Sequence, residues 1–208
     1  MTTSPVPPVA LRHGREVEDP LRVVLAFLET WRIDIGDRSS AFGEPDLRLA
    51  NRGGARISGA EIAEILARRS TIQRALKAIA PDASLTGAAS SVPWLPLKQL
   101  FEAFADIRGV GFAKMTKALH PKRPAMIPML DSVVRKYLAD DDPGAEASFG
   151  ERALGLVRGY KRDLDRNRMA VRALRRELAA RGYDLTEVRI LDLLIWSVEV
   201  PATTRAGP

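Results

Sequence analysis

A dense run of apolar residues near the C-terminus constrains the fold of this chain more than any other feature. A helix that starts at Thr186 would carry apolar residues on every side, namely Val188, Ile190, Leu191, Leu193, Leu194, Ile195 and Trp196. Such a helix is stable only when other elements cover it, so we predict that it lies at the centre of the core. Asp192 falls inside this run, and we expect it to be paired with Arg189 or with an arginine of the preceding helix.

Helical patterns continue over most of the chain, and no stretch alternates in the way of a strand. Capping boxes, in which a serine is followed three residues later by Glu or Gln, mark helix starts at Ser58, Ser70 and Ser148. Apolar residues at helical spacing predict a first helix over residues 21–31, two helices within 58–80, one over 97–107 and a long helical stretch over 148–181 with Gly159 as a candidate break. We therefore predict an all-α fold with about eight helices.

The two ends of the chain differ from its middle. Residues 1–19 contain three prolines and no apolar period, which indicates a disordered N-terminal arm, and residues 200–208 have the character of a tail. Residues 20–199 form one helical domain in this interpretation, and the small, polar segment 82–95 is where two lobes would divide. Residues 32–57 are poor in helical period and predict a long loop.

Composition sets outer bounds on function. The chain has 46% hydrophobic and 28% charged residues, as soluble globular proteins do, and its net charge of +6 favours a polyanionic partner over a neutral one. Zero cysteines exclude disulfides and thiolate metal sites, and His120 has no second histidine at ligand spacing, so we expect no metal. No run approaches the length of a membrane span; we expect a cytoplasmic protein, monomeric and without a membrane partner.

The stretch over residues 107–138 carries the strongest functional signal. Gly109-Val110-Gly111 predicts a tight hairpin whose N–H groups open the next helix, and a helix start with free donors binds anions. From Ile107 through Leu130 there is no acidic residue, whereas five are basic: Arg108, Lys114, Lys117, Lys122 and Arg123. The pattern predicts a phosphate ligand; the alternative is an ordinary helical corner in which the glycines only permit the turn.

The continuation of this stretch resembles the helix-hairpin-helix DNA glycosylases, which act in base excision repair. That family joins a hydrophobic-x-Gly-hydrophobic-Gly hairpin to a Pro-x-x-Asp at a fixed distance. Here Asp131 follows Gly111 by twenty residues, and Pro128 stands three residues before it. The resemblance covers about thirty residues. The same core also resembles bacterial proteins of unassigned function, and that second resemblance implies no particular activity.

The resemblance implies different roles for the hairpin, which would bind DNA, and for the aspartate, which would be catalytic. Gly109, Val110 and Gly111 would hold a phosphate of duplex DNA, with a monovalent cation on the carbonyl side in some members. Asp131 would be the catalytic carboxylate that faces the sugar of a flipped nucleotide, because cleavage of an N-glycosidic bond builds positive charge there. The alternative for Asp131 is a plain N-cap, since an aspartate that opens a helix satisfies free amides without any substrate.

Departures from the family pattern narrow the expected chemistry. Bifunctional members carry a lysine two residues after the second hairpin glycine, and this chain has Ala113 there, so strand-nicking lyase activity is not expected. Met115 stands where the family prefers a small residue. The absence of cysteine rules out the iron–sulfur cluster of some members, so we expect no cofactor.

Other polar residues are weaker candidates for DNA contact. Asp34, Asp37 and Asn51 could read a base edge, although these residue types also dominate turns. Trp94 could stack on a base, with core packing as the alternative. Five arginines over residues 152–181 could extend the DNA-binding surface, or they could only keep their helix face solvated. They are Arg158, Arg162, Arg166, Arg172 and Arg176.

Three hypotheses follow from these observations. The first is a monofunctional DNA glycosylase. The second is a non-catalytic DNA-binding module, whose affinity falls steeply with salt. The third is a helical protein-interaction domain that binds no nucleic acid.

Overall fold

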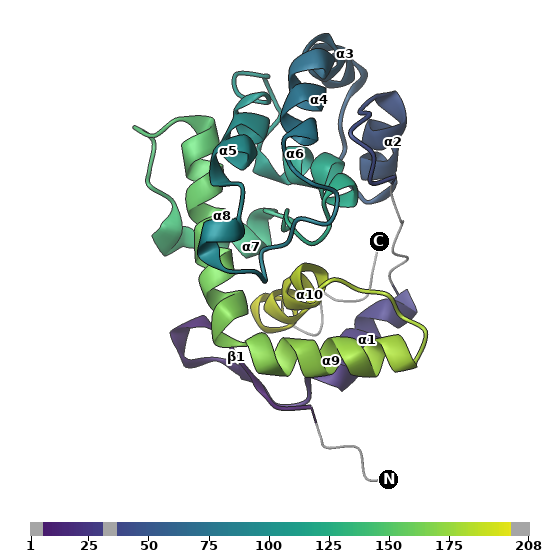
Figure 1. Cartoon of the computed structure of the whole chain (residues 1–208), viewed down its shortest axis with the longest axis vertical. Helices are drawn as coiled ribbons and strands as arrows, with labels where there is room; N and C mark the ends of the chain where they lie inside the picture. The colour runs from purple at the N-terminus through teal and green to yellow at the C-terminus, as the bar shows by residue number, and fades with distance from the viewer. Residues whose placement is uncertain (1–5, 31–36, 201–208) are drawn as a thin grey trace.

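The computed structural model describes residues 6–30 and 37–200, and it has an all-α architecture (Figure 1). One group of helices, at the top of Figure 1, contains α2 (Glu44–Arg52), α3 (Gly59–Ala67), α4 (Arg69–Lys77), α5 (Trp94–Glu102), α6 (Phe112–Leu119) and α7 (Ser132–Tyr137). A second group, at the bottom, contains α1 (Pro20–Thr30), α9 (Arg168–Ala180) and α10 (Glu187–Glu199). The long helix α8 (Phe149–Arg166) runs along one side and connects the two groups.

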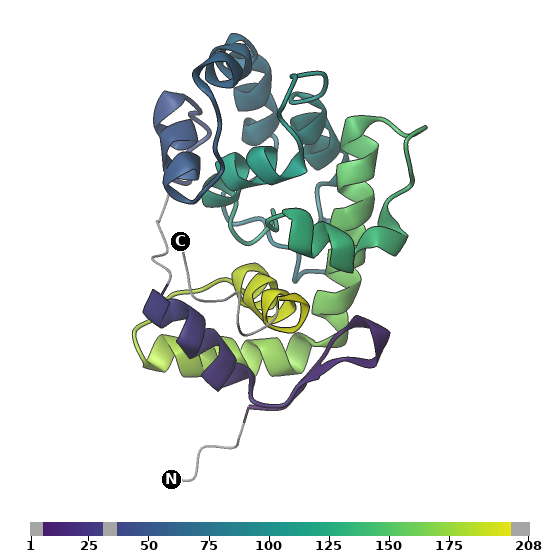
Figure 2. The ribbon, with the colours of Figure 1, turned by 180° about the vertical axis from the view of Figure 1, so that it is seen from behind.

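Helix α10 lies at the centre of the molecule, as its apolar sequence predicts. Residues on all of its sides are buried, and it packs against α1, α7, α8 and α9. Figure 2, seen from behind, shows α10 between α9 and the segment that carries α6 and α7. The prediction of a central C-terminal helix is therefore confirmed, and α10 forms the contact between the two groups.

Local capping signals fix several helix starts. Ser58 and Ser148 accept hydrogen bonds from the N–H groups of Glu61 and Glu151, which confirms two of the predicted capping boxes. The boundary between α3 and α4 falls at Arg68 and not at Ser70. The predicted 148–181 stretch is broken at Asn167, whose side chain bonds to the backbone of Ala10.

Gly159 does not break α8 but allows a close contact on it. A Cβ atom at this position would overlap the carboxylate of Asp141, which follows α7. Gly155, one turn earlier, would collide in the same way with the backbone of Asp141 and with Pro143. Both glycines therefore let the 139–143 segment lie directly on α8.

The prediction of a disordered arm over residues 1–19 is wrong for residues 6–19. They form a small hairpin of β1 (Val9–Ala10) and β2 (Glu16–Val17), a strand pair that the sequence did not signal. The hairpin is anchored by Arg12, whose guanidinium pairs with Asp163 at 2.6 Å and Asp141 at 2.5 Å. Burial of Val9 and Val17 adds to this anchor.

Two further expectations about the N-terminal half also fail. The 32–57 region contains α2, an amphipathic helix that buries Leu47 and Ala50, so it is not simply a loop. The 82–95 segment does not divide two lobes, because α4 before it and α5 after it pack against each other. The first predicted helix corresponds to α1, and Trp31 lies outside the described residues.

Within residues 6–30 and 37–200, no helix is both long and apolar enough to cross a membrane.

Candidate nucleic-acid interface

The predicted hairpin lies between α5 and α6 and ends at an uncapped helix. Gly109 has φ +83°, in the left-handed region that favours glycine, and the Val110 N–H donates to Ile107 O at 3.0 Å. Gly111 is the N-cap of α6, and no side chain caps it. The amides of Phe112 and Ala113 have no acceptor within the helix, as expected for its first turn. The start of α6 therefore presents free donors and the positive end of the helix dipole.

Exposed arginines surround this helix start. Arg108 immediately precedes the hairpin, and Arg135 of α7 lies over the Phe112 ring, 5.0 Å from its centroid. Arg152 of α8 stacks on the same ring at 5.6 Å, but Asp142 holds it through two hydrogen bonds of 2.8 and 2.9 Å. We call the amides of Phe112 and Ala113, with Arg108 and Arg135, the α6 N-terminal site. Arg135 was missed in the sequence, although it stands one helical turn after Asp131.

An open hollow of about 340 Å³ adjoins the same region. It is lined by Ser132, Arg135, Lys136, Ala139 and Asp142, so it lies along the outer side of α7.

Lys114 is not free for the phosphate contact that its position suggested. Its ammonium bonds to both carboxylate oxygens of Glu61, at 2.6 and 2.8 Å. Partial burial of Glu61 disfavours its charged form, but hydrogen bonds from Lys114 and Ser58 outweigh this effect and lower its pKa. The Glu61 carboxylate also lies directly against Gly109. Lys114 thus anchors α3 to the hairpin.

Lys122 and Arg123 are buried, which contradicts the expectation that they point outward to phosphates. Lys122 is 2% exposed and pairs with Asp46 at 2.8 Å and Asp37 at 3.5 Å. Arg123 is fully buried and donates to the carbonyls of Ile79, Leu76 and Arg38, each at 2.8 Å. Both side chains fasten the loop before Asp131 to the upper group of helices.

Asp131 is the N-cap of α7 and is half-buried. Its Oδ1 accepts from the N–H groups of Val133 and Val134, both at 3.0 Å, so the N-cap role is confirmed. Its Oδ2 accepts from the indole Nε1–H of Trp196 on α10, also at 3.0 Å. Three donors from two helices therefore fix the orientation of this carboxylate.

The hairpin helix itself positions the loop that carries Asp131. The Thr116 hydroxyl of α6 donates to Phe112 O at 2.7 Å and accepts from the Leu130 N–H at 3.0 Å. His120 Nδ1 lies 2.6 Å from Ile127 O, and burial lowers the His120 pKa to about 4. The ring is thus neutral at pH 7 and donates Nδ1–H to that carbonyl. α6 and the Asp131 loop form one hydrogen-bonded unit.

A polar stripe on α10 faces this unit. Arg189, Asp192 and Trp196 stand at i, i+3 and i+7, so they share one side of an otherwise apolar helix. Arg189 Nη1 lies 3.6 Å from Met129 Sδ, and Asp192 Oδ2 accepts from the Met129 N–H at 3.4 Å. This spacing was visible in the sequence and is the signal that would have found Trp196.

Asp192 is a buried acid with incomplete pairing. Burial raises its pKa to about 7, the charge of Asp131 adds to this, and the charge of Arg189 opposes it. Its Oδ1 has no hydrogen-bond partner among the described residues. The expected pairing with Arg189 is therefore a charge interaction, and no ion pair within 4 Å joins the two among those residues.

Lys117 is half-buried and lies near enough to Asp131 to feel its charge. Its Nζ donates to the carbonyls of Gly53 at 3.0 Å and Gly54 at 3.3 Å. Burial lowers its pKa, and the charges of Arg189 and Arg56 lower it further, while Asp131 acts in the opposite sense.

The weaker candidates have structural partners. The Asn51 side chain is engaged by the N–H and carbonyl of Ile57, and Asp37 accepts from the Ser39 N–H at 2.8 Å. Asp34 lies outside the described residues. Trp94 is half-buried and donates to Ala89 O at 2.9 Å, with Arg158 over its ring. None of these contacts favours base reading.

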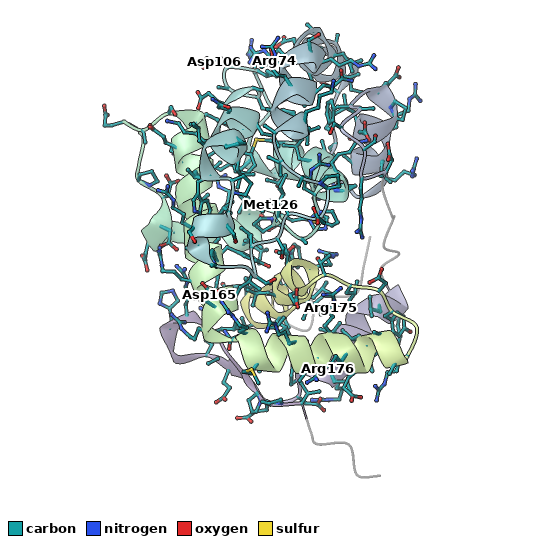
Figure 3. The ribbon with its side chains drawn as sticks, in the orientation of Figure 1. Arg74, Asp106, Met126, Asp165, Arg175 and Arg176 are labelled. Carbon is teal, nitrogen blue, oxygen red and sulfur yellow. The ribbon has the colours of Figure 1, made fainter. Side chains whose placement is uncertain are left out.

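The predicted arginine stripe is divided between α8 and α9. Arg162 pairs with Asp141, and Arg166 pairs with Asp163 at 3.2 Å. Figure 3 labels Arg176 on the outer side of α9, whereas its neighbour Arg175 lies toward α10 and pairs with Glu187 at 3.6 Å. Arg176 therefore faces away from α6 and α7.

Comparison with known proteins assigns the chain to a family. Residues 36–199 match the model of DUF6308, a family of unknown function, and the chain belongs to that family. No curated protein and no solved structure was found to match it. In the part of the chain that the structure describes, no three His, Asp or Glu residues gather in a way that could hold a metal ion.

Proposed function

We propose that this protein binds the phosphate backbone of duplex DNA at the α6 N-terminal site. One observation carries the proposal: α6 begins at Gly111 without a side-chain cap, between the exposed Arg108 and Arg135. Free amides and the helix dipole attract an anion, and two guanidinium groups can donate charge-assisted hydrogen bonds to its oxygens. Two acids lie nearby, and each has a basic partner: Glu61 pairs with Lys114, and Asp142 pairs with Arg152.

Salt-dependent binding tests the proposal. Fluorescence anisotropy of a labelled DNA duplex, titrated at several salt concentrations, gives the affinity and the number of phosphates contacted, because each contact adds about 0.9 to the slope of log K against log salt. Arg135→Gln and Arg108→Gln should each weaken binding about tenfold or less and lower the slope by about 1. Arg176→Gln on α9 is the matched control and should bind as the native protein does.

Two results would contradict this function. Equal weakening by Arg176→Gln would indicate that net charge alone attracts DNA. A native protein that shows no DNA affinity at physiological salt would instead favour a helical protein-interaction domain.

A second candidate function is hydrolysis of an N-glycosidic bond by Asp131. It is favoured by a half-buried carboxylate whose orientation is fixed by Val133, Val134 and Trp196 and which α6 connects to the proposed phosphate contact. In this reaction the C1′–N bond of a flipped nucleotide breaks and the base leaves with the bonding electrons. Asp131 stabilises the cationic sugar and orients the water that adds to C1′; the water's proton is lost to solvent, and the departing base takes up one proton from solvent. With Ala113 in place of a lysine, no Schiff base forms and the strand stays intact.

A base-release assay separates this enzyme from a binding module. Duplexes that each carry one damaged base are incubated with native protein and with Asp131→Asn. Because Asn is as good an N-cap as Asp, the variant should fold and bind DNA, although its amide nitrogen cannot accept the Trp196 hydrogen bond, and base release should be lost. Base release that persists in Asp131→Asn, or its absence from the native protein on every duplex, would leave only the binding function.

A further inference from the structure

Three cations from three separate segments gather beside Asp131. Lys117 of α6 bonds to Gly53 O and Gly54 O, which places its ammonium against the turn that leads to Arg56. Arg189 of α10 lies on Met129, two residues before Asp131. Arg56 and Arg189 both lower the pKa of Lys117, and Asp131 raises it, so all four charges are close enough to act on one ammonium.

Among the described residues these three cations have no ion-pair partner, whereas several buried or half-buried lysines do. Lys114, Lys122 and Lys161 each pair with a carboxylate at 2.6 to 2.9 Å. Within residues 6–30 and 37–200, no ion pair within 4 Å involves Lys117, Arg56 or Arg189. Two acids face the cluster: Asp131 is engaged by Trp196 and two amides, and Asp192 is buried against Met129.

The cluster has an electrostatic cost that a ligand would offset. Like charges brought together at a partly desolvated position disfavour each other, and the lowered pKa of Lys117 reflects both effects. Arg56 also has φ +54°, a conformation that non-glycine residues rarely adopt. The bonds of the Asn51 side chain to Ile57 hold the backbone of this turn, and the Arg56 side chain is exposed. An anion that bound here would find the Lys117 ammonium already held at this turn.

We propose that Lys117, Arg56 and Arg189, which we call the Lys117 site, bind a second phosphodiester of the DNA strand held at the α6 N-terminal site. This inference rests on the proposed function and adds a second contact to it. Lys117 stands six residues after Gly111, a distance of about 9 Å along the helix axis. The strand winds round the duplex axis, so its successive phosphates lie further apart than the axial rise of about 3.4 Å per nucleotide, and the two sites suit phosphates one or two nucleotides apart. The nucleotide between them would lie next to Asp131.

The test compares both sites in one experiment. Arg189→Gln and Arg56→Gln are titrated with the labelled duplex beside Arg135→Gln and the Arg176→Gln control, at several salt concentrations. Each Lys117-site variant should weaken binding about fivefold to tenfold, as for loss of a charge-assisted hydrogen bond, and lower the salt slope by about 1. Arg189 packs against Met129 and its variant could disturb the fold, whereas Arg56 is exposed, so Arg56→Gln keeps the test decisive.

The outcomes distinguish the two proposals. If Arg135→Gln weakens binding and both Lys117-site variants bind with native affinity and slope, the second site is overturned while the first stands. If only the Lys117-site variants weaken binding, the phosphate lies at the Lys117 site and the α6 N-terminal site is wrong. If the native protein does not bind DNA, both proposals fail.

Discussion

Replacement of Gly109 by alanine should destabilise the protein through two separable effects. At φ +83° an L-residue costs about 1–2 kcal/mol relative to glycine. The new Cβ would also overlap the Glu61 carboxylate, which must swing away from Lys114. Loss of that partly exposed ion pair adds about 0.5–1 kcal/mol, so the total should be about 1.5–3 kcal/mol.

A double-mutant cycle in urea separates the two effects. Gly109→Ala is compared in the native background and in Glu61→Ala, where no carboxylate obstructs the methyl group and only the backbone cost remains. Gly111→Ala is the matched control, because Gly111 has φ −92° and nothing lies near its missing Cβ. It should cost about 0.5 kcal/mol through the poorer N-cap. Equal losses at the two glycines, or a Gly109 effect that Glu61→Ala does not reduce, would refute this account of the hairpin.

Three other predictions concern buried groups. Arg123→Met should destabilise the protein by about 3–5 kcal/mol in urea unfolding, because it removes the guanidinium donor from the carbonyls of Ile79 and Arg38. A loss below about 1 kcal/mol would contradict the burial of this guanidinium. Trp196→Phe keeps most of the packing but removes the hydrogen-bond donor to Asp131, so the free energy of unfolding should fall by about 1 kcal/mol. Any base release should also become slower. Base release at the native rate would show that Trp196 does not contribute to the activity of Asp131. The pKa of Asp192 is raised to about 7 in the folded protein, so its contribution to the free energy of unfolding is fully present below its unfolded pKa near 4 and is lost as the pH rises to about 7. The pKa of His120 is lowered to about 4, so its contribution is present above its unfolded pKa of about 6.5 and is lost as the pH falls to about 4. Native protein should therefore lose stability relative to Asp192→Asn as pH rises from 4 to 7, and a pH-independent difference would contradict the raised pKa.

Local signals in the sequence were enough to predict much of the helical framework. Capping boxes at Ser58 and Ser148 depend on residues three positions apart, and the apolar run of α10 could only be buried. The N-cap role of Asp131 is equally local. These features were predictable because their causes lie within a few residues of one another.

Contacts between distant segments could not be predicted in this way. Lys122 and Arg123 are residue types typical of a surface loop, but their partners lie in the segment before α2, on α2, and at the end of α4. These partners are some forty to eighty-five residues earlier in the chain. The N-terminal hairpin is ordered because Arg12 meets Asp163, which lies 151 positions away. A charge pattern alone does not show whether a cation pairs inside the fold or faces solvent.

The candidate site shows the same limit. The sequence indicated the hairpin and Asp131 as site residues. Arg135, Arg189 and Trp196 belong to the candidate site only because α7 and α10 lie beside the hairpin and the Asp131 loop. The polar positions of α10 were a usable signal, since three polar side chains on one side of an apolar helix must face something polar.

Amide chemical shifts measured during a titration with duplex DNA test the central claim most directly. We predict that the largest changes fall at Gly111, Phe112 and Ala113, followed by Arg56 and Arg189. Changes confined to α9, or none at DNA concentrations well above the protein concentration, would contradict binding at the start of α6.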